Sequence, residues 1–227
     1  MKQGIAKILR GEQEAYLQRL LPPRDALLRE MEERAASEDL PISDPEVGRL
    51  LSILARSTGA RRILEIGTAI GYGTLCLARG SVEARVLSID TDAGRLAAAR
   101  SYLERAGVAE RVELLLGPAL EVLPQLEGPF DLAYVDAVKV EYRRYLDLLL
   151  PRLRVGGLVV IDNLLWAGEV AEPDPAEEAG GNAAALRAFN GYLMTHPQLE
   201  SVVLPLGDGV GLATKLRPLR SEMGGPF

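Results

Sequence analysis

The apolar residues of this chain recur at two different spacings. From about residue 24 to residue 57 they follow helical spacing, which breaks at Leu40-Pro41 and restarts at Ser43-Asp44-Pro45, where a capping residue precedes a first-turn proline. After this helical extension, assigned to residues 1–58, short β-branched apolar runs alternate with longer amphipathic segments. The alternation predicts a single α/β domain with its core over residues 59–217, in which helices cover both faces of a mostly parallel sheet.

One predicted strand runs against the others. Two late segments, Ser201–Leu206 and Val210–Lys215, are separated only by Gly207-Asp208-Gly209, which is too short for a crossover helix. The last strand must therefore be antiparallel, whereas the ordinary dinucleotide-binding version of the doubly wound fold is usually all parallel. The five strands expected before this pair are Arg62–Ile66, Arg85–Ile89, Val112–Leu116, Leu132–Val135 and Leu158–Ile161.

Composition narrows the class of protein. The chain has 227 residues, 48% of them hydrophobic, which suits one well-buried core. Its net charge of -6 argues against a nucleic-acid surface over the whole protein, although Arg61-Arg62 and Arg143-Arg144 leave a local patch open. The lone Cys76 excludes an internal disulfide, and the charged N-terminus fits neither a signal peptide nor a transmembrane helix. We therefore expect a cytoplasmic protein without a membrane partner.

Three features of the sequence are not expected to take part directly in catalysis. Segment 169–181 is acidic, rich in Pro and Gly and without periodicity, so we expect a mobile loop that serves either as a lid or as a plain connector. Residues 221–227 are expected to fray. The only histidine, His196, precedes a proline and is expected to end a helix. A zinc site is not expected, because a single histidine and a single cysteine are too few to form one.

A glycine-rich turn follows the first predicted strand. Its glycines permit a tight turn and bring backbone N–H groups to a ligand at the start of a helix. The spacing is not G-x-G-x-x-G, and a carboxylate two residues before the first glycine would repel a pyrophosphate but can pair with a cationic amino acid. The turn favours S-adenosylmethionine over NAD, with candidate contacts at Glu65, Gly67, Thr68, Gly71, Tyr72 and Gly73.

The next two strands also end in candidate cofactor contacts. Asp90 closes the second strand roughly twenty residues after the turn, where such folds place a carboxylate that holds ribose hydroxyls. The alternative is that Asp90 caps the following helix, a task that Thr91 or Asp92 could also perform. The third strand ends at Gly117-Pro118-Ala119, a break that lets an adenine lie flat against the chain. Thr91, Pro118 and Ala119 are therefore added to the candidate contacts.

Charged residues follow the fourth and fifth strands. Asp136 and Lys139 come after the fourth strand, and Asp162-Asn163 comes after the fifth, so all four reach the same edge of the sheet. Asp136, Asp162 and Asn163 supply three hard oxygen ligands suited to Mg²⁺ or another divalent cation such as Mn²⁺ or Ca²⁺, and Asp136 also borders the cofactor. Lys139 is the candidate base, because a lysine can lose its proton beside a cation and an arginine cannot. The alternative is a surface lysine paired with Glu141.

With these residues the sequence resembles the cation-dependent class I O-methyltransferases, the family of catechol O-methyltransferase and caffeoyl-CoA O-methyltransferase. The resemblance covers nearly the whole chain and rests on four motifs together. They are Leu64-Glu65-Ile66-Gly67-Thr68 followed by Gly71-Tyr72, Asp136 with Lys139 and Tyr142, Gly156-Gly157 before Asp162-Asn163, and Asp208-Gly209.

The resemblance implies a seven-stranded sheet, in-line transfer of a sulfonium methyl group to an acceptor oxygen, and a homodimer. It implies metal binding by Asp136, Asp162 and Asn163, a base at Lys139, and cofactor contacts at Glu65, Gly67 and Asp90. The sequence departs from the family at Gly73, where many members have serine, at Ala137-Val138, and at Pro118, which leaves the adenine contacts open. Catechols, phenolic CoA esters and a hydroxylated uridine of tRNA all stay open as acceptors.

The sequence leaves open two other functions for the protein and the roles of three further residues. An NAD-dependent oxidoreductase would explain the glycine turn and Asp90 but not Asp162-Asn163, and a catalytically silent cofactor-binding module would not explain the retained ligands and base. Trp166 and Tyr192 either line the acceptor pocket or pack in the core. Asn190 either lies near the substrate or caps its helix.

Overall fold

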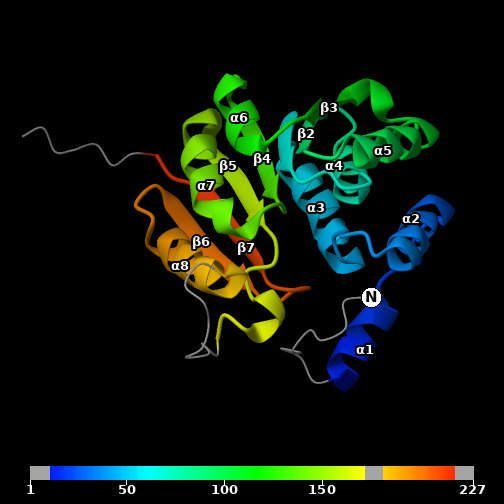
Figure 1. Ribbon diagram of the computed structural model, residues 1–227, viewed down its shortest axis with the longest axis horizontal. Coiled ribbons are helices and arrows are strands. Elements are labelled where there is room, and N and C mark those ends of the chain that lie inside the picture. Colours follow the sequence, from blue (N-terminus) through cyan, green and yellow to red (C-terminus); the bar gives the residue numbers. More distant parts are fainter. Residues whose placement is uncertain (1–10, 172–180, 218–227) are drawn as a thin grey trace, which may run out of the picture.

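The computed structural model describes residues 11–171 and 181–217 and contains one mixed sheet of seven strands (Figure 1). The strand order is β3-β2-β1-β4-β5-β7-β6, and only β7 runs antiparallel to its two neighbours. This confirms the predicted doubly wound sheet with an antiparallel last strand. The strands are β1 (Arg62–Ile66), β2 (Arg85–Asp90), β3 (Val112–Leu116), β4 (Phe130–Val135), β5 (Leu153–Ile161), β6 (Leu199–Leu204) and β7 (Val210–Lys215).

Helices cover both faces of the sheet and enclose two apolar clusters. One cluster lies between the sheet and α2 to α5, and the other between the sheet and α6 to α8. The α-helices are α1 (Gly11–Leu20), α2 (Ala26–Glu38), α3 (Pro45–Ser57), α4 (Tyr72–Gly80), α5 (Ala93–Arg105), α6 (Ala119–Val122), α7 (Tyr142–Leu149) and α8 (Asn182–Thr195). Short 3₁₀ turns are η1 (Ala109–Arg111), η2 (Leu123–Gln125), η3 (Lys139–Glu141), η4 (Leu150–Arg152) and η5 (Trp166–Gly168).

The helical extension packs on the sheet domain through α2 and α3. Helix α2 is capped by the side chain of Asp25 and ends before Asp39, which adopts a left-handed conformation. Helix α3 begins at Pro45 as expected and approaches α4 closely at Gly48, where a Cβ atom would lie 2.9 Å from the Cys76 sulfur. By contrast, α1 lies at the periphery of the molecule, below α2 in Figure 1, and leaves Tyr16 and other apolar side chains exposed.

Three strands differ by two residues or more from their predicted bounds, each for a local reason. Strand β5 begins at Leu153 instead of Leu158, because a register shift against β4 lets the strand pass through its two glycines. For the same reason β4 begins at Phe130, which pairs with Leu153. Strand β6 begins and ends two residues earlier than predicted. It ends before Pro205, which has no N–H to donate to the hydrogen-bond ladder of the sheet.

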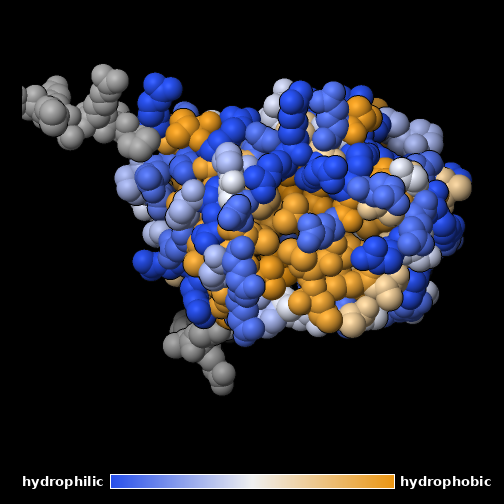
Figure 2. Space-filling model, turned by 90° about the horizontal axis from the view of Figure 1, so that it is seen from above, coloured by the Kyte–Doolittle hydropathy of each residue, from blue (hydrophilic) through white to orange (hydrophobic). Residues whose placement is uncertain are grey.

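The α6 end of the molecule carries a broad apolar area. This end lies at the top of Figure 1 and faces the viewer in Figure 2. Helix α6 has only four residues, so it leaves the apolar side chains of β2 and β3 incompletely covered. The half-buried apolar side chains on this side of the sheet include Leu87, Leu115, Leu120 and Val122.

Two of the expected segments lie largely outside the described residues. Most of segment 169–181, namely residues 172–180, is not among them, and neither is 221–227. The described part holds no helix that is long and apolar enough to cross a membrane. The cytoplasmic location stays a prediction.

Candidate active site

A cavity of about 440 Å³ opens at the carboxyl ends of the parallel strands. The ends of β1 and β2, the loops that follow β1 to β5, and the linker that precedes α3 contribute to its wall. This is the edge at which doubly wound sheets bind their ligands, because the loops on either side of the first strand diverge there. The predicted site residues that line the cavity are Gly67, Thr68, Tyr72, Gly73, Asp90, Thr91, Ala119, Asp136, Lys139, Asp162 and Asn163.

The turn after β1 is shaped by glycine at two positions. Gly67 has a φ of 102°, and a Cβ atom there would lie 2.0 Å from the carbonyl oxygen of Asp136. The loops after β1 and β4 therefore meet at a distance that only glycine allows. Gly71, with a φ of 89°, directly precedes α4 and packs against Ala99 of α5. Gly71 thus supports the cavity wall from behind and does not line it.

Asp90 is held in place by the turn and does not cap α5. Its Oδ2 accepts a hydrogen bond from the Ala69 backbone at 2.8 Å, and its Oδ1 accepts one from the Asp92 backbone at 2.9 Å. The cap of α5 is Asp92, whose side chain accepts from the Arg95 backbone. A carboxylate has further acceptor capacity beyond these two bonds, so Asp90 can still receive hydroxyl groups from a ligand in the cavity.

Glu65 lies behind the cavity wall with one oxygen unpaired. Its Oε2 accepts hydrogen bonds from the hydroxyls of Thr74 and Ser88, while its buried Oε1 has no partner among the described residues. Burial raises the pKa of the Glu65 carboxyl to about 8. A Cβ atom on Gly73, which lines the cavity, would lie 2.6 Å from Oε1. The free oxygen therefore stands next to a gap in the wall, and this arrangement fits a cationic amino group bound nearby.

The opposite end of the cavity is acidic. Asp162 is 3% exposed and accepts hydrogen bonds from the Tyr134 hydroxyl at 2.7 Å and the Asn163 backbone at 2.8 Å. Burial and the neighbouring charge of Asp136 raise the pKa of the Asp162 carboxyl to about 7. Two carboxylates facing one cavity are stabilised by a cation between them, so this pair fits the predicted metal.

Lys139 also faces this end. Its Nζ lies 2.7 Å from Oδ1 of Asp136. The alternative partner, Glu141, instead accepts a hydrogen bond from the Tyr145 hydroxyl at 2.5 Å. The interpretation of Lys139 as a surface lysine paired with Glu141 is therefore wrong. Its side chain is only 11% exposed and borders the cavity, as a base must.

Asn163 is oriented by a residue that the sequence reasoning did not assign. Its Nδ2 lies 3.3 Å from Oδ2 of Asp208, in the turn between β6 and β7. Because an ionised carboxylate only accepts hydrogen bonds, Asp208 fixes the amide nitrogen on its own side and leaves Oδ1 of Asn163 available as a ligand. Asp208 also accepts a bond from the Ala167 backbone at 2.6 Å.

The comparison with protein families decides the class. The model of the O-methyltransferase family matches residues 19–216. The chain belongs to this family. A catechol O-methyltransferase from Mycobacterium tuberculosis is 39% identical over 160 residues, which are 69% of this chain and 70% of that protein. Tricin synthase 1 from Oryza sativa is 36% identical over 187 residues, 77% of this chain and 74% of that protein.

Solved structures of O-methyltransferases agree in fold. The crystal structure of the O-methyltransferase from Bacillus cereus in complex with SAH is similar with a TM-score of 0.80 and 32% identity, covering 90% of this chain and 97% of that one. The assignment of this chain to the S-adenosylmethionine-dependent class I O-methyltransferases is thereby confirmed. This assignment rules out the alternative that the chain is an NAD-dependent oxidoreductase.

Of the remaining candidate site residues of this O-methyltransferase, some line the active-site cavity and others lie outside it. Trp166 lines the cavity, and Ala137-Val138 do so as well. Asn190 lies within α8 and donates to the Leu164 carbonyl at 2.8 Å, so it neither caps the helix nor lines the cavity. Tyr192 donates to Asp147. Pro118 is exposed before α6, outside the cavity lining, and His196 ends α8 as expected.

A buried hydroxyl pair behind the acidic end also escaped the sequence reasoning. Oγ of Ser43 lies 2.9 Å from the hydroxyl of Tyr134, which in turn donates to Asp162. Ser43 precedes α3 and Tyr134 belongs to β4, so 91 residues of sequence separate them. No local pattern connects such distant positions. Tyr134 reads in the sequence as one more apolar strand residue.

Proposed function

We propose that this protein transfers the methyl group of S-adenosylmethionine to a hydroxyl of a small aromatic acceptor, and that the acceptor is held by a divalent cation on Asp136, Asp162 and Asn163. The observation that carries the proposal is the division of one cavity into two ends. Asp90 and the glycine turn line one end, and the two carboxylates and Lys139 lie at the other. Relatives named as catechol O-methyltransferases support the aromatic acceptor.

The donor end is suited to an amino acid joined to a nucleoside. S-adenosylmethionine supplies a methyl group that its sulfonium already activates. The unpaired oxygen of Glu65 favours the ammonium group of the methionine part, and Asp90 has acceptor capacity for the ribose hydroxyls. Ala119 and Thr91 line the stretch of wall between β2 and α6, beside which we place the adenine. The chain thus orients the donor without chemistry of its own.

The acceptor end is suited to a chelated hydroxyl. A bound Mg²⁺ or similar cation would polarise the acceptor hydroxyl and favour its ionised form. Asp136, Asp162 and Oδ1 of Asn163 offer the oxygen ligands that such cations prefer. Lys139 takes the hydroxyl proton on Nζ when its amine is neutral, and Asp136 keeps that nitrogen at the acceptor end. Trp166 and Val138 are the apolar wall against which an aromatic ring can lie.

The direct test is methyl transfer from labelled S-adenosylmethionine to a panel of vicinal dihydroxy aromatics, run with Mg²⁺, with EDTA and with Mg²⁺ restored after EDTA. The proposal expects turnover that EDTA abolishes and Mg²⁺ restores. Turnover that persists in EDTA would remove the cation from the proposal. Turnover confined to phenolic CoA esters or to a hydroxylated uridine of tRNA would replace the acceptor, and binding without turnover on every acceptor would favour a silent module.

We also propose that the protein forms a homodimer through the apolar area at its α6 end. Leu115 of β3 and Leu120 of α6 are only half-buried there, as is expected of side chains that a second copy covers. Light scattering of Leu120→Asp should show a smaller mass than wild type at the same concentration. The control is Val82→Asp, since Val82 is 78% exposed in the turn before β2 and should leave the mass unchanged. A wild-type monomer would overturn the proposal.

A further inference from the structure

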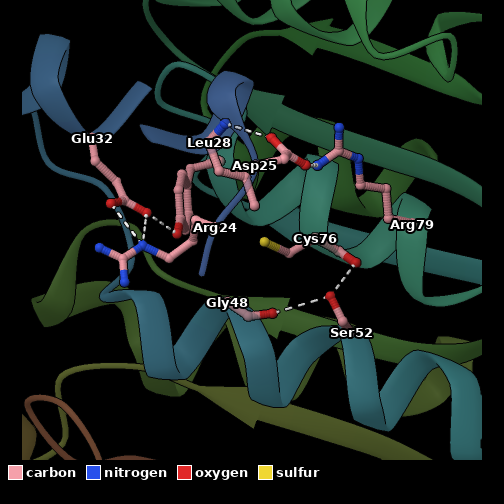
Figure 3. Close-up of polar contacts among 9 residues, drawn as sticks. Arg24, Asp25, Leu28, Glu32, Gly48, Ser52, Cys76 and Arg79 are labelled. Carbon is pink, nitrogen blue, oxygen red and sulfur yellow. Dashed lines mark hydrogen bonds and ion pairs between the residues drawn. The ribbon is translucent and has the colours of Figure 1, made fainter. Parts of the chain in front are cut away.

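A second cavity, of about 320 Å³, lies outside the active site on the other side of Tyr72. It is bounded by the linker between α1 and α2, by one face of α3 and by α4. Figure 3 shows Arg24 and Asp25 from the linker, Gly48 and Ser52 from α3, and Cys76 and Arg79 from α4 around this space. Tyr72 is the one residue among the described ones that lines both cavities.

The charge of this lining is opposite to that of the whole chain. Four arginines line the second cavity, and Asp25 is the only carboxylate among its described lining residues. The chain as a whole carries a net charge of -6. A concentration of one sign of charge in a hollow raises the local concentration of ligands of the opposite sign. The lining arginines are Arg24, Arg49, Arg56 and Arg79.

Most of the guanidinium N–H groups are free to bind a ligand. Arg49 and Arg56 form no hydrogen bond or ion pair with any residue in the described ranges, and both lie on the face of α3 that carries Ser52. Arg24 meets Glu32 through Nε alone, at 2.9 Å, and Arg79 meets Asp25 through Nη1, at 2.5 Å. The terminal nitrogens of Arg24 and Nη2 of Arg79 therefore keep donors that these ion pairs do not use.

The same residues connect this cavity to the active site. Glu32 of α2 accepts hydrogen bonds from Nε of Arg24 and from the Tyr72 hydroxyl, the latter at 2.7 Å. Tyr72 is 2% exposed and begins α4, directly after the glycine turn of the donor end. A ligand that engages Arg24 thus lies two contacts away from the wall of the cofactor cavity.

We infer that this second cavity is a binding site for a small phosphate-bearing anion. Guanidinium groups bind phosphate oxygens in paired, charge-assisted hydrogen bonds, and several arginines around one hollow suit a diphosphate better than a single charge. The apolar part of the lining, Leu21, Pro22, Pro23 and Leu28, offers contact to whatever the phosphates are attached to. The site does not depend on the proposed methyl transfer, since none of its four arginines lines the active cavity.

The test is calorimetric titration of the full chain with inorganic pyrophosphate at fixed ionic strength. The test variant is Arg49→Gln with Arg56→Gln, and the control is Arg100→Gln with Arg144→Gln, which removes two exposed arginines from α5 and α7. We expect saturable binding to wild type and to the control, and affinity at least about tenfold lower in the test variant. Because Arg49 and Arg56 are exposed and unpaired with described residues, the test variant should fold like wild type.

Two further arms locate the ligand and identify its source. Cys76 lines the cavity and is the only cysteine, so pyrophosphate should slow its alkylation, which is already slow because burial raises the pKa of the Cys76 thiol to about 12. A nucleoside diphosphate that binds more tightly than pyrophosphate indicates a phosphorylated metabolite, and equal affinity indicates the free anion.

Four results would overturn the inference. The first is the absence of saturable binding up to about 10 mM pyrophosphate, which lies beyond ordinary millimolar affinity. The second is equal affinity in the test variant and the control, and the third is equal affinity for malonate, which carries two carboxylates and no phosphate. The fourth is complete competition by S-adenosylhomocysteine, which would place the anion in the active-site cavity.

Discussion

The two ends of the active-site cavity are built from different parts of the chain. The donor end depends on backbone geometry, since Gly67 and Gly71 adopt positive φ and the Ala69 backbone holds Asp90. The acceptor end depends on charged side chains, which Tyr134 and Asp208 hold from behind. One cavity thus contains two functions whose supporting residues are separate, so that substitutions should disable one end and leave the other intact.

The largest effect is expected from Asp162→Ala at the acceptor end. Loss of the buried ligand should reduce cation-dependent turnover by about 10³-fold, because a bound metal contributes several kcal/mol to stabilising charge in the transition state. Calorimetry should find nearly unchanged affinity for S-adenosylhomocysteine. Asp147→Ala, at an exposed position on α7, is the matched control and should leave turnover unchanged. If cofactor binding disappears together with activity, the two ends are not separate.

The next largest effect concerns the base. Lys139→Met should lower kcat by about 10²-fold at neutral pH, with partial recovery at higher pH, where more of the acceptor is already ionised. Lys139→Arg keeps the positive charge beside Asp136 but cannot release a proton, so it should be about as slow. Full activity in the arginine variant would show that the residue acts through its charge alone.

A smaller effect is expected from the support behind the acceptor end. In Asp208→Asn the new amide can satisfy only one of the two donors that Asp208 now accepts, so the Asn163 amide loses its fixed orientation. Affinity for Mn²⁺, measured by paramagnetic resonance, should fall by about tenfold, while affinity for S-adenosylhomocysteine stays the same. Unchanged Mn²⁺ affinity would remove Asp208 from the site.

The smallest effect is a pH dependence of stability at the donor end. Burial raises the pKa of Glu65 from 4.5 to about 8, so the folded protein holds a proton there that the unfolded chain has released. Stability of the ligand-free protein should therefore fall as pH rises from about 4.5 to about 8. Thermal unfolding of Glu65→Gln should show a flatter pH profile over this range, because an amide does not titrate. Parallel profiles for the two proteins would contradict this pKa.

The sequence predicted the residues that line the two ends of the active-site cavity better than the residues that hold them in place. Asp90, Asp136 and Asp162 each close a strand, and the carboxyl ends of parallel strands share an edge, so a correct strand assignment was enough to bring them together. The pairing of Asn163 with Asp208 could not be predicted in the same way, because it depends on how the turn before β7 folds against the loop after β5.

The cation is expected to act at the acceptor end of the cavity and to leave the donor end intact. The most direct measurement follows turnover and affinity for S-adenosylhomocysteine on the same sample of protein, first with Mg²⁺ and then with EDTA. EDTA is expected to abolish turnover and to leave the affinity within about twofold of its value with Mg²⁺. Turnover that survives in EDTA, or affinity that is lost together with turnover, would contradict this expectation.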